Sequence, residues 1–495
     1  IGCAGVVSGA TITNQPTGDG LWSTPGNWIG GVAPAGGDTV VLIEYNGYAP
    51  TTVDIANLAL DYLYFSNGTA GITLTGNDFL FNTIICLPKS APRVTNTIEQ
   101  NIKMTRMAPG NFDPTFGIAN NSALRLNGVL GVTNPACGLQ YTTRSELGGS
   151  TGGLTLLMNT NTFAKGIGGL YTRLIFFNDA ALGAVLPTNV PAYIQYINEA
   201  RLVPSSTGGY NRVTIHENRG LRTQGNSRLV TEGDVKVVFR GTLTLGDGTM
   251  NFFDGDNANN IIVVSGSNAF AGPVTVSGSA KNDVVVMDNP AAFDTSYLGN
   301  ELNVGSAFDF NGHDLLTLRP YTVNNAGFFG SGVFRNNHPG AASTIGRDTG
   351  FSGSSAIMFG GRGDIVVAGD LRNRGGIGGP LRKAGTGTVI LQGATRATND
   401  VSVRAGTLVC DYRNSSEPKL SLVNQLLNVR GATVRFIGSD TTPVTENITE
   451  LNGTESGVAQ GAAALEIIAG SNQNVTLAAE RLRLSQGDSL DISLS

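Results

Sequence analysis

The sequence predicts an all-β protein in which short strands wind into a parallel β-helix, also called a β-solenoid. The chain has 495 residues, of which 68 are glycine and 14% are charged, whereas surface helices need charged residues and disfavour glycine. Short apolar runs recur between Gly, Asn and Asp residues, with too little room between them for helices. Asn-Gly pairs, which mark two-residue hairpins, are scarce between these runs, so winding is favoured over hairpins.

The first segment, residues 1–45, is expected to form an N-terminal strand and a cap. An alternating pattern that includes Val6, Val7 and Ile12 predicts the strand. The chain's only tryptophans, Trp22 and Trp28, follow in a Gly- and Pro-containing segment just before an apolar run. Such rings could stack on sugars, but the open end of a solenoid needs a cover, so we expect them to plug the first coil.

Residues 46–495 are expected to form the solenoid itself. Coils of about 20 to 25 residues would give roughly 20 coils. The section near 88–149 is expected to be irregular or looped out, because it contains five prolines and proline cannot donate to an interior ladder.

The clearest strand pattern lies in the C-terminal third, where short apolar runs recur at close intervals. These runs are 387–391, 401–403, 406–410, 419–423, 426–429, 432–437, 448–451, 465–468, 474–477, 481–484 and 490–494. Each suits a short strand bounded by a turn. Stacking of such strands, coil upon coil, would line up their apolar residues inside the solenoid.

Residues 381–394, with Lys383, Gly385 and Gly387, are followed by a strand that ends in Gly406-Thr-Leu408. This pattern resembles the autotransporter-associated β-strand repeat of bacterial surface proteins, although residues 397–400 replace the expected Tyr-x-Gly corner. Looser copies that bring the resemblance to about half of the chain are 152–183, 241–245 and 308–318, and 20–42 resembles the start of such proteins. The resemblance implies an exported, passenger-like solenoid, located outside the cell or on a bacterial cell surface.

Paired carboxylates could form a polysaccharide-cleaving site, since glycosidases use two carboxyl groups. The candidate pairs are Asp254 with Asp256, Glu232 with Asp234, and Asp309 with Asp314. Each lies in a Gly- or Asn-containing stretch where Asp normally serves a turn, so no catalytic residue is expected. Calcium binding near Asp254 and Asp256 stays open, because the spacing only partly suits a calcium loop.

Neither a metal site nor a cofactor site is expected elsewhere. The three histidines, His216, His313 and His338, lack the spacing of zinc ligands. The four cysteines are scattered, and their pairing stays open: Cys3, Cys86, Cys137 and Cys410.

The charge balance argues against nucleic acid as a partner, and the hydropathy pattern argues against a membrane-spanning helix. With 32 basic and 37 acidic residues, the chain offers no basic field for nucleic acid. It also contains no apolar run of about 18 residues that would form a membrane-spanning helix.

The partner that the sequence favours is another copy of the chain. Leu490, Ile492 and Leu494 alternate with polar residues up to Ser495 and lack the Pro or Lys that would protect an exposed strand edge. Val6, Val7 and Ile12 could add to such an edge by strand exchange. We therefore expect a structural protein that forms a fibre or layer by end-to-end self-association. The alternatives are an adhesion rod that binds surface carbohydrate and a β-helical enzyme that degrades polysaccharide.

Overall fold

The computed structural model of the chain describes residues 9–66, 69–87, 93–105, 115–135, 137–141, 153–170, 173–197, 201–204, 212–224, 227–231, 235–245, 250–252, 260–270, 273–276, 283–293, 301–304, 306–322, 332–351, 356–373, 379–395, 400–420, 426–451, 462–471, 473–484 and 489–495. Over these residues the chain is all-β, and its helical elements are two short 3-10 turns, η1 (Pro25–Asn27) and η3 (Asp179–Leu182). Parallel sheets stack as a β-solenoid of about 14 turns, which confirms the predicted fold class. The chain divides into two compact units, 1–248 and 249–495. The predicted boundary at residue 45 stays a prediction.

The first unit is built from three groups of parallel strands. The first sheet runs in the order β1 (Thr11–Thr13), β2 (Thr39–Leu42), β4 (Ala59–Phe65), β6 (Phe79–Cys86), β9 (Thr115–Ile118), β12 (Leu139–Tyr141), β14 (Ile167–Leu170), β16 (Val190–Ile197), β19 (Arg219–Gln224) and β22 (Leu243–Leu245). The second runs β3 (Thr52–Val53), β5 (Thr73–Gly76), β7 (Val94–Ile98), β10 (Ser122–Leu126), β13 (Leu154–Leu157), β15 (Arg173–Phe176), β17 (Arg201–Pro204) and β20 (Ser227–Leu229). A third group pairs β18 (Arg212–Ile215) with β21 (Lys236–Phe239).

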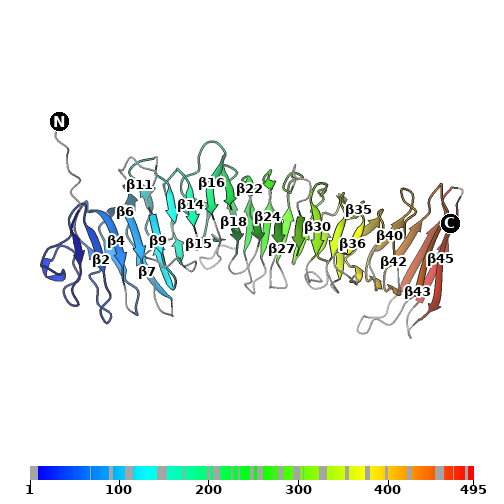
Figure 1. Cartoon of the computed structure of the whole chain (residues 1–495), viewed down its shortest axis with the longest axis horizontal. Coiled ribbons are helices and arrows are strands. Elements are labelled where there is room, and N and C mark those ends of the chain that lie inside the picture. The colour runs from blue at the N-terminus through cyan, green and yellow to red at the C-terminus, as the bar shows by residue number, and fades with distance from the viewer. Residues whose placement is uncertain are drawn as a thin grey trace. The chain divides into compact units, whose positions relative to one another are not determined.

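Strand alternation creates the core of this unit, because every second side chain points inward. Parallel pairing places Ile12, Val40, Leu63, Ile84 and Phe116 directly above one another on successive strands. All five are buried. In Figure 1 the strands that carry this column, β2, β4, β6 and β9, follow one another along the blue part of the unit.

The described residues of the section near 88–149 are less irregular than a looped-out insertion would be, and residues 88–92, 106–114 and 142–149 lie outside the described residues. The section contributes β7, β9, β10 and β12 to the two sheets of the unit, all in parallel register. The irregularity is smaller: β8 (Ile102–Met104) and β11 (Leu130–Val132) branch from the sheet, because β6 pairs with β8 along its first half and with β9 along its second. Pro135 lies in a turn, where its missing N–H costs no ladder bond, and the other four prolines lie outside the described residues.

The second unit also consists of parallel sheets. One contains β23 (Met250–Phe252), β26 (Val274–Val276), β28 (Glu301–Val304), β30 (Arg319–Thr322), β33 (Thr349–Phe351) and β36 (Leu371–Asn373). Another contains β24 (Ile261–Val264), β27 (Val284–Met287), β29 (Ala307–Asp309), β31 (Phe334–Asn336), β34 (Ile357–Gly361), β37 (Leu381–Lys383), β39 (Asp400–Val403), β41 (Leu426–Val429), β43 (Val444–Leu451) and β45 (Val475–Leu482). The third contains β32 (Ser343–Ile345), β35 (Ile365–Val367), β38 (Thr388–Leu391), β40 (Thr407–Asp411), β42 (Thr433–Ile437), β44 (Ala462–Ile468) and β46 (Ser489–Leu494), and β25 spans Ala269–Phe270.

A ladder of phenylalanine rings fills part of the second unit. Successive ring centroids lie 5.0 to 6.4 Å apart, and all six rings are buried: Phe252, Phe293, Phe308, Phe310, Phe334 and Phe359. Contacts at this spacing add to the free energy that burial of each ring already contributes.

The number of coils is smaller than expected, about 14 turns instead of roughly 20. Some coils are longer than the expected length of about 20 to 25 residues. Thr83 lies beside Thr115, and Val434 lies beside Leu465, so these coils use 32 and 31 residues.

Candidate functional site

Trp22 and Trp28 are buried together at the start of the first unit. Their ring centroids lie 5.5 Å apart in an edge-to-face arrangement, and Trp22 also lies 6.5 Å from Phe79. The indole N–H of Trp28 donates to the Trp22 carbonyl at 2.9 Å, and that of Trp22 donates to the Pro50 carbonyl at 3.2 Å. Neither ring has an exposed face for a sugar. Their assignment as a cap stays a prediction, with which this geometry agrees.

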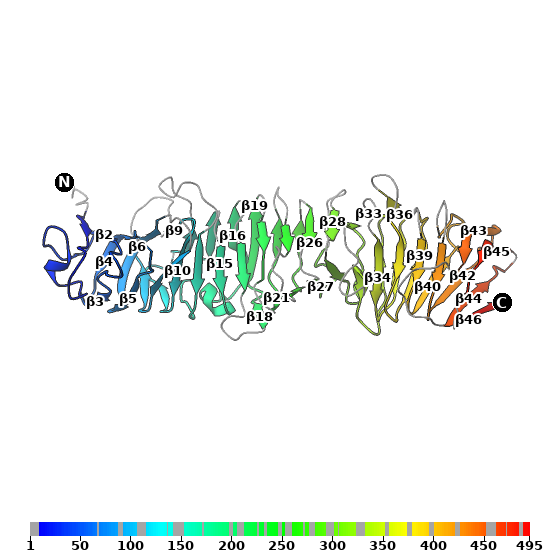
Figure 2. The same cartoon turned by 90° about the horizontal axis from the view of Figure 1, so that it is seen from below.

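The segment around the tryptophans, residues 14–33, which we call the N-terminal cap, also covers part of the outer edge of β1. The Ile29 N–H donates to the Thr13 carbonyl, and the Gln15 N–H donates to the Asn27 carbonyl, each at 2.8 Å. These bonds occupy backbone groups that point away from β2. In Figures 1 and 2 the dark-blue loop that includes this segment lies on the side of β2 away from β4.

Two carboxylates hold a turn of the N-terminal cap. Asp19 accepts hydrogen bonds from the Leu21 N–H at 3.0 Å and the Thr24 hydroxyl at 2.9 Å, while Asp54 accepts from the Ser23 N–H at 2.8 Å. The backbone bond from Leu21, followed by side-chain bonds, keeps the pKa of Asp19 below its ordinary value. Burial would raise the pKa of Asp54, but the bonds from Ser23 outweigh it and lower the pKa. Both side chains are therefore anionic near neutral pH.

The residues proposed for self-association at the N-terminus differ in what the structure says of them. Ile12 lies beside Val40 and is buried within its own coil, so it is not displayed to a partner. Val6 and Val7 lie outside the described residues.

The residues proposed for self-association at the C-terminus continue an interior column of the solenoid. Parallel pairing stacks Val389, Leu408, Val434, Leu465 and Ile492 on successive strands. The first four are buried, with Leu465 at 1% exposure, whereas Ile492 is 54% exposed. Inward-facing side chains thus become accessible on the last described coil.

The neighbouring positions of this last coil behave in the same way. Leu490 and Leu494 lie beside Ala463 and Ile467, and Leu494 is 75% exposed. On β45, Leu482 lies beside the buried Leu451 and is 56% exposed. We call residues 473–484 and 489–495 the terminal coil. In the part of the chain that the structure describes, its strands β45 and β46 pair on one side only.

The exposed apolar side chains concentrate at the two termini. The described residues include nine exposed large apolar side chains, and six of them lie in the N-terminal cap or the terminal coil: Ile29, Val32, Leu482, Leu484, Ile492 and Leu494. Of these six residues, the sequence pattern predicts only Ile492 and Leu494 as self-association residues. Leu482 and Leu484 belong to the run 481–484, which was predicted as a strand, and both side chains are exposed.

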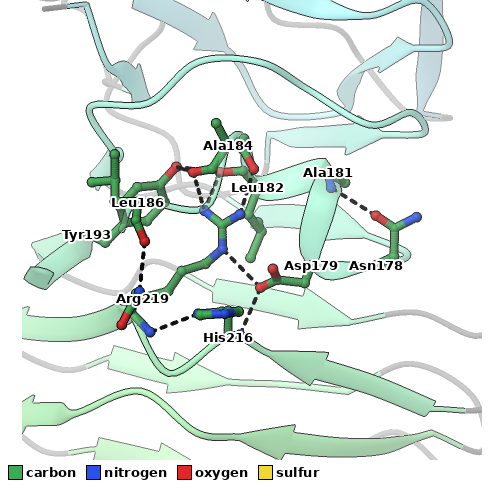
Figure 3. Close-up of polar contacts among 11 residues, drawn as sticks. Asn178, Asp179, Ala181, Leu182, Ala184, Leu186, Tyr193, His216 and Arg219 are labelled. Atoms are coloured by element: carbon green, nitrogen blue, oxygen red, sulfur yellow. Dashed lines mark hydrogen bonds and ion pairs between the residues drawn. The ribbon is translucent and has the colours of Figure 1, made fainter. Parts of the chain in front are cut away.

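A buried cation lies in the middle of the first unit. Figure 3 shows the guanidinium of Arg219 between Asp179 of η3 and the carbonyls that follow it. Its Nε donates to Asp179 at 2.9 Å, its Nη1 donates to the Leu182 carbonyl at 3.2 Å, and its Nη2 donates to the Gly183 carbonyl. Its central carbon lies 4.7 Å from the centre of the Tyr193 ring.

The chain's own acceptors satisfy this cluster. Asn178 caps η3 by accepting from the Ala181 N–H, which fixes Asp179 in place, and the His216 N–H donates to the same Asp179 oxygen. The Tyr193 hydroxyl donates to the Leu182 carbonyl at 3.0 Å. This cluster stabilises the fold rather than binding a ligand, because the guanidinium of Arg219 donates to acceptors of the chain itself. Sequence reasoning missed it, since no spacing motif links residues 40 positions apart.

Two further buried polar groups occur in the second unit. The ammonium of Lys383 donates to the carbonyls of Ala384, Gly385 and Ala405 at 2.8 to 3.0 Å, and burial lowers its pKa to about 8. Near it in sequence, the Tyr412 hydroxyl donates to Glu446, and burial raises the pKa of both groups. Lys383 belongs to the repeat-like motif at 381–394, so its role there is to hold carbonyls of two successive coils together.

Of the carboxylates considered as catalytic pairs, Asp309 and Asp314 are described, and both accept hydrogen bonds from backbone N–H groups. Asp309 accepts from the N–H groups of Asn311 and Asn337 at 3.0 and 3.1 Å, and Asp314 accepts from the Thr344 N–H at 2.6 Å. Glu232, Asp234, Asp254 and Asp256 lie outside the described residues. Whether calcium binds near Asp254 therefore stays an open prediction.

No group of three or more His, Cys, Asp or Glu side chains among the described residues could hold a metal ion. Cys86, Cys137 and Cys410 are buried, and Cys3 lies outside the described residues. Burial raises the pKa of the Cys410 thiol well above its ordinary value, which makes it a poor nucleophile.

A surface cavity of about 510 Å³ lies in the second unit, next to the turn that contains Asp314. Its lining combines apolar side chains, including the exposed Leu316, with the polar side chains of His313, Asp314 and Thr317. Phe293 also contributes to the lining but is otherwise buried. The cavity therefore offers polar contacts without an exposed aromatic platform.

Comparisons with known proteins add no relative to this description. No family model, curated protein or solved structure matches the chain. Among the described residues, no helix has the length and apolar character needed to cross a membrane. What is established is thus a parallel β-helix repeat protein.

Proposed function

We propose that the chain is an exported structural protein whose β-solenoid subunits self-associate into an extracellular or cell-surface fibre or layer. One observation carries the proposal: the interior side chains of the terminal coil, including Ile492 and Leu494, are exposed to solvent. Covering apolar surface is favourable by about 25 cal/mol per Å², so this coil favours a partner that buries it. A second copy is the partner that the proposal names.

The proposed location rests on the repeat-like motif at 381–394 and 401–408, which resembles repeats of bacterial autotransporter passengers. Within this motif Lys383 donates to the Ala405 carbonyl of the following coil, and Gly387 approaches the Gly363 carbonyl of the preceding coil. Immunolabelling of intact and permeabilised cells of the source organism tests this part. Signal confined to permeabilised cells would contradict export.

Self-association is tested by light scattering over a range of protein concentrations. We expect the mass of the intact chain to rise with concentration. The paired substitution Ile492→Ser and Leu494→Ser should lower the association constant by about tenfold or more, because it removes exposed apolar contacts. Leu316→Ser, which alters an exposed leucine elsewhere, is the matched control. A wild-type chain that stays monomeric at every concentration would refute the proposal.

We also infer that the chain is not a hydrolase or lyase. Asp309 and Asp314 support this inference, because Asp309 accepts from the Asn311 N–H in its own turn and Asp314 accepts from the Thr344 N–H of β32. Assays on acidic and neutral polysaccharides are the test. Turnover that disappears in Asp309→Asn or Asp314→Asn, with folding intact, would reverse the inference.

The cavity beside Asp314 favours one alternative, an adhesion protein that binds carbohydrate. Hydroxyl groups of a sugar could bond to His313 and Asp314 while a ring face contacts Leu316. A glycan array distinguishes a carbohydrate-binding adhesion protein from a purely structural protein. Binding that is lost in His313→Ala and kept in His216→Ala would favour adhesion.

A further inference from the structure

We infer that the first units of two copies bind side by side in opposite directions, through surfaces of opposite charge. The inference rests on the proposed self-association, to which it adds a lateral contact that uses neither end of the chain. Residues 9–87 of each copy lie against residues 93–240 of the other in this contact. We call the described parts of these two ranges the acidic band and the basic band.

Charge is strongly segregated along the sequence of the first unit. Residues 1–88 contain six carboxylates and no Lys or Arg, which gives a side-chain charge of −6. Residues 89–240 contain 15 Lys and Arg against eight Asp and Glu, which gives +7. The strands of both sheets follow one another in chain order, so the two ranges form consecutive groups of coils. In Figure 1, β2 and β4 belong to the acidic band, and β14 and β16 belong to the basic band.

The carboxylates of the acidic band are bound by uncharged donors. Asp61 accepts from the side-chain amide of Asn82 at 3.0 Å, and Asp78 accepts from the Asn101 N–H at 3.1 Å. Such donors leave the negative charge of a carboxylate in place. Four carboxylates of the band are exposed or half-buried and lie in no ion pair within the described residues: Asp19, Asp54, Asp61 and Asp78.

Exposed cations without a carboxylate partner distinguish the basic band. Within the described residues, six exposed Lys and Arg side chains of this band lie in no ion pair: Arg93, Lys103, Arg212, Arg222, Lys236 and Arg240. Arg212 of β18 lies directly beside Lys236 of β21 in parallel register, and like charges at opposed positions destabilise a sheet. An anionic partner that lies across both side chains removes this cost.

The second unit, in contrast, pairs several of its exposed cations within the chain. Arg372, Arg413 and Arg435 each lie 2.5 to 3.2 Å from a carboxylate. Between described residues of the first unit, the one ion pair is the buried contact of Arg219 with Asp179. The exposed cations of the first unit therefore favour a partner from outside that unit.

A second copy provides this partner because each first unit carries both signs of charge. Two units in opposite directions place the acidic band of each against the basic band of the other, so every attraction occurs twice in a symmetric contact. Units that run in the same direction would place like charges together. A free polyanion would be attracted by the basic band but repelled by the acidic band beside it, and the whole chain has a net charge of −5. A second copy is therefore favoured over an acidic polysaccharide.

The salt dependence of association is the first test. The parent chain for it is the full-length protein with Ile492→Ser and Leu494→Ser, in which the end contact of the proposed function is weakened. Light scattering should show that this parent associates at about 20 mM salt, and about 200 mM salt should weaken the association by about tenfold or more, since exposed charges are screened. A parent that stays monomeric at low salt overturns the inference, even where the chain with intact Ile492 and Leu494 associates.

Charge reversal in the parent chain is the second test. The acidic-band variant adds Asp61→Lys and Asp78→Lys, and the basic-band variant adds Arg222→Glu and Lys236→Glu. Each alone should associate about tenfold or more weakly than the parent at low salt. Mixed in equal amounts, the two variants should associate more strongly than either alone, because one intact acidic band then meets one intact basic band.

Arg347→Glu with Arg362→Glu is the matched control, because these two arginines of the second unit lie in no ion pair within the described residues. The control should associate as the parent does, and circular dichroism must show that every variant is folded. The inference is overturned by a band variant that associates like the parent, by a control that is equally weakened, or by a mixture no stronger than its components. Association that appears only after an acidic polysaccharide is added also overturns it, in favour of an external polyanion. The proposed function fails separately, if the chain with intact Ile492 and Leu494 stays monomeric.

Discussion

Buried charges in this solenoid are held by bonds between side chains and turns, and Arg219 is the clearest case. Its guanidinium is buried and donates to Asp179 and to backbone carbonyls after η3. A single Arg beside glycine gives no signal of this in sequence, because its partners lie far away along the chain. Residues that bond within a motif are easier to find, whereas such distant partners become visible only with the fold.

We expect Arg219→Met to lower the free energy of unfolding by about 3–5 kcal/mol, because it leaves Asp179 and several carbonyls without their buried donor. Urea unfolding followed by circular dichroism measures the change. Arg372→Met is the control: Arg372 pairs with Asp348 and Asp370 on the surface, so its loss should cost less than about 1 kcal/mol. Equal effects of the two substitutions would show that burial of Arg219 has no special role.

Lys383 provides a test by pH. Burial lowers its pKa to about 8, below the value of about 10.4 in an unfolded chain. Between these values the unfolded state binds more protons than the folded state, so this group makes the folded state more stable as pH rises. Relative to Lys383→Met, the wild type should gain up to about 1.4 kcal/mol per pH unit across this window. The exposed Lys236→Met serves as control, and pH curves of wild type and Lys383→Met that run parallel would contradict the assignment.

At the scale of strands and turns, glycine positions repeat from coil to coil because backbones approach closely there. A Cβ on Gly387 would lie 2.2 Å from the carbonyl oxygen of Gly363, and one on Gly393 would lie 2.2 Å from that of Gly369. These pairs are 24 residues apart, one coil each. The glycines of the repeat-like motif thus mark the points where successive turns stack.

Gly387→Ala should therefore destabilise the protein by about 1–3 kcal/mol, the usual cost of forcing extra atoms into a packed site. Gly36→Ala is the matched control, because a Cβ at Gly36 meets nothing within 4 Å. Thermal unfolding compares the two. If Gly387→Ala melts like the wild type, the close stacking of turns is not required for stability.

Much of the strand pattern could be predicted at this scale, but not every segment. Alternation correctly indicated strands such as β38, β40 and β42, since inward positions must be apolar in every coil. The individual strands of the section near 88–149 were not predicted, because prolines interrupt its alternation of apolar and polar residues. Pairing of β7 with β10 depends on partners in neighbouring coils, which local patterns do not reveal.

At the scale of the whole molecule, the sequence indicated winding but not the length of each coil. The solenoid has about 14 turns and not roughly 20, because some coils use more residues than the 20 to 25 expected. The exposed interior of the terminal coil was likewise only partly foreseen. Leu490, Ile492 and Leu494 were predicted from their alternation, whereas the exposure of Leu482 is visible only in the structure.

Removal of residues 1–8 separates the two modes of assembly. Strand exchange through Val6 and Val7 would require this segment, whereas association through the exposed side chains of the terminal coil does not. We expect the shortened chain to associate as the intact chain does in light scattering. A shortened chain that is monomeric would favour strand exchange instead.

X-ray fibre diffraction from aligned assemblies tests the central claim most directly, namely that copies continue the stacking of coils end to end. Strands in each coil would then lie across the fibre axis, with neighbouring strands spaced along it. The account predicts a strong reflection at about 4.8 Å on the meridian, the direction of the fibre axis. The same reflection on the equator would show that copies associate side by side, and would contradict the claim.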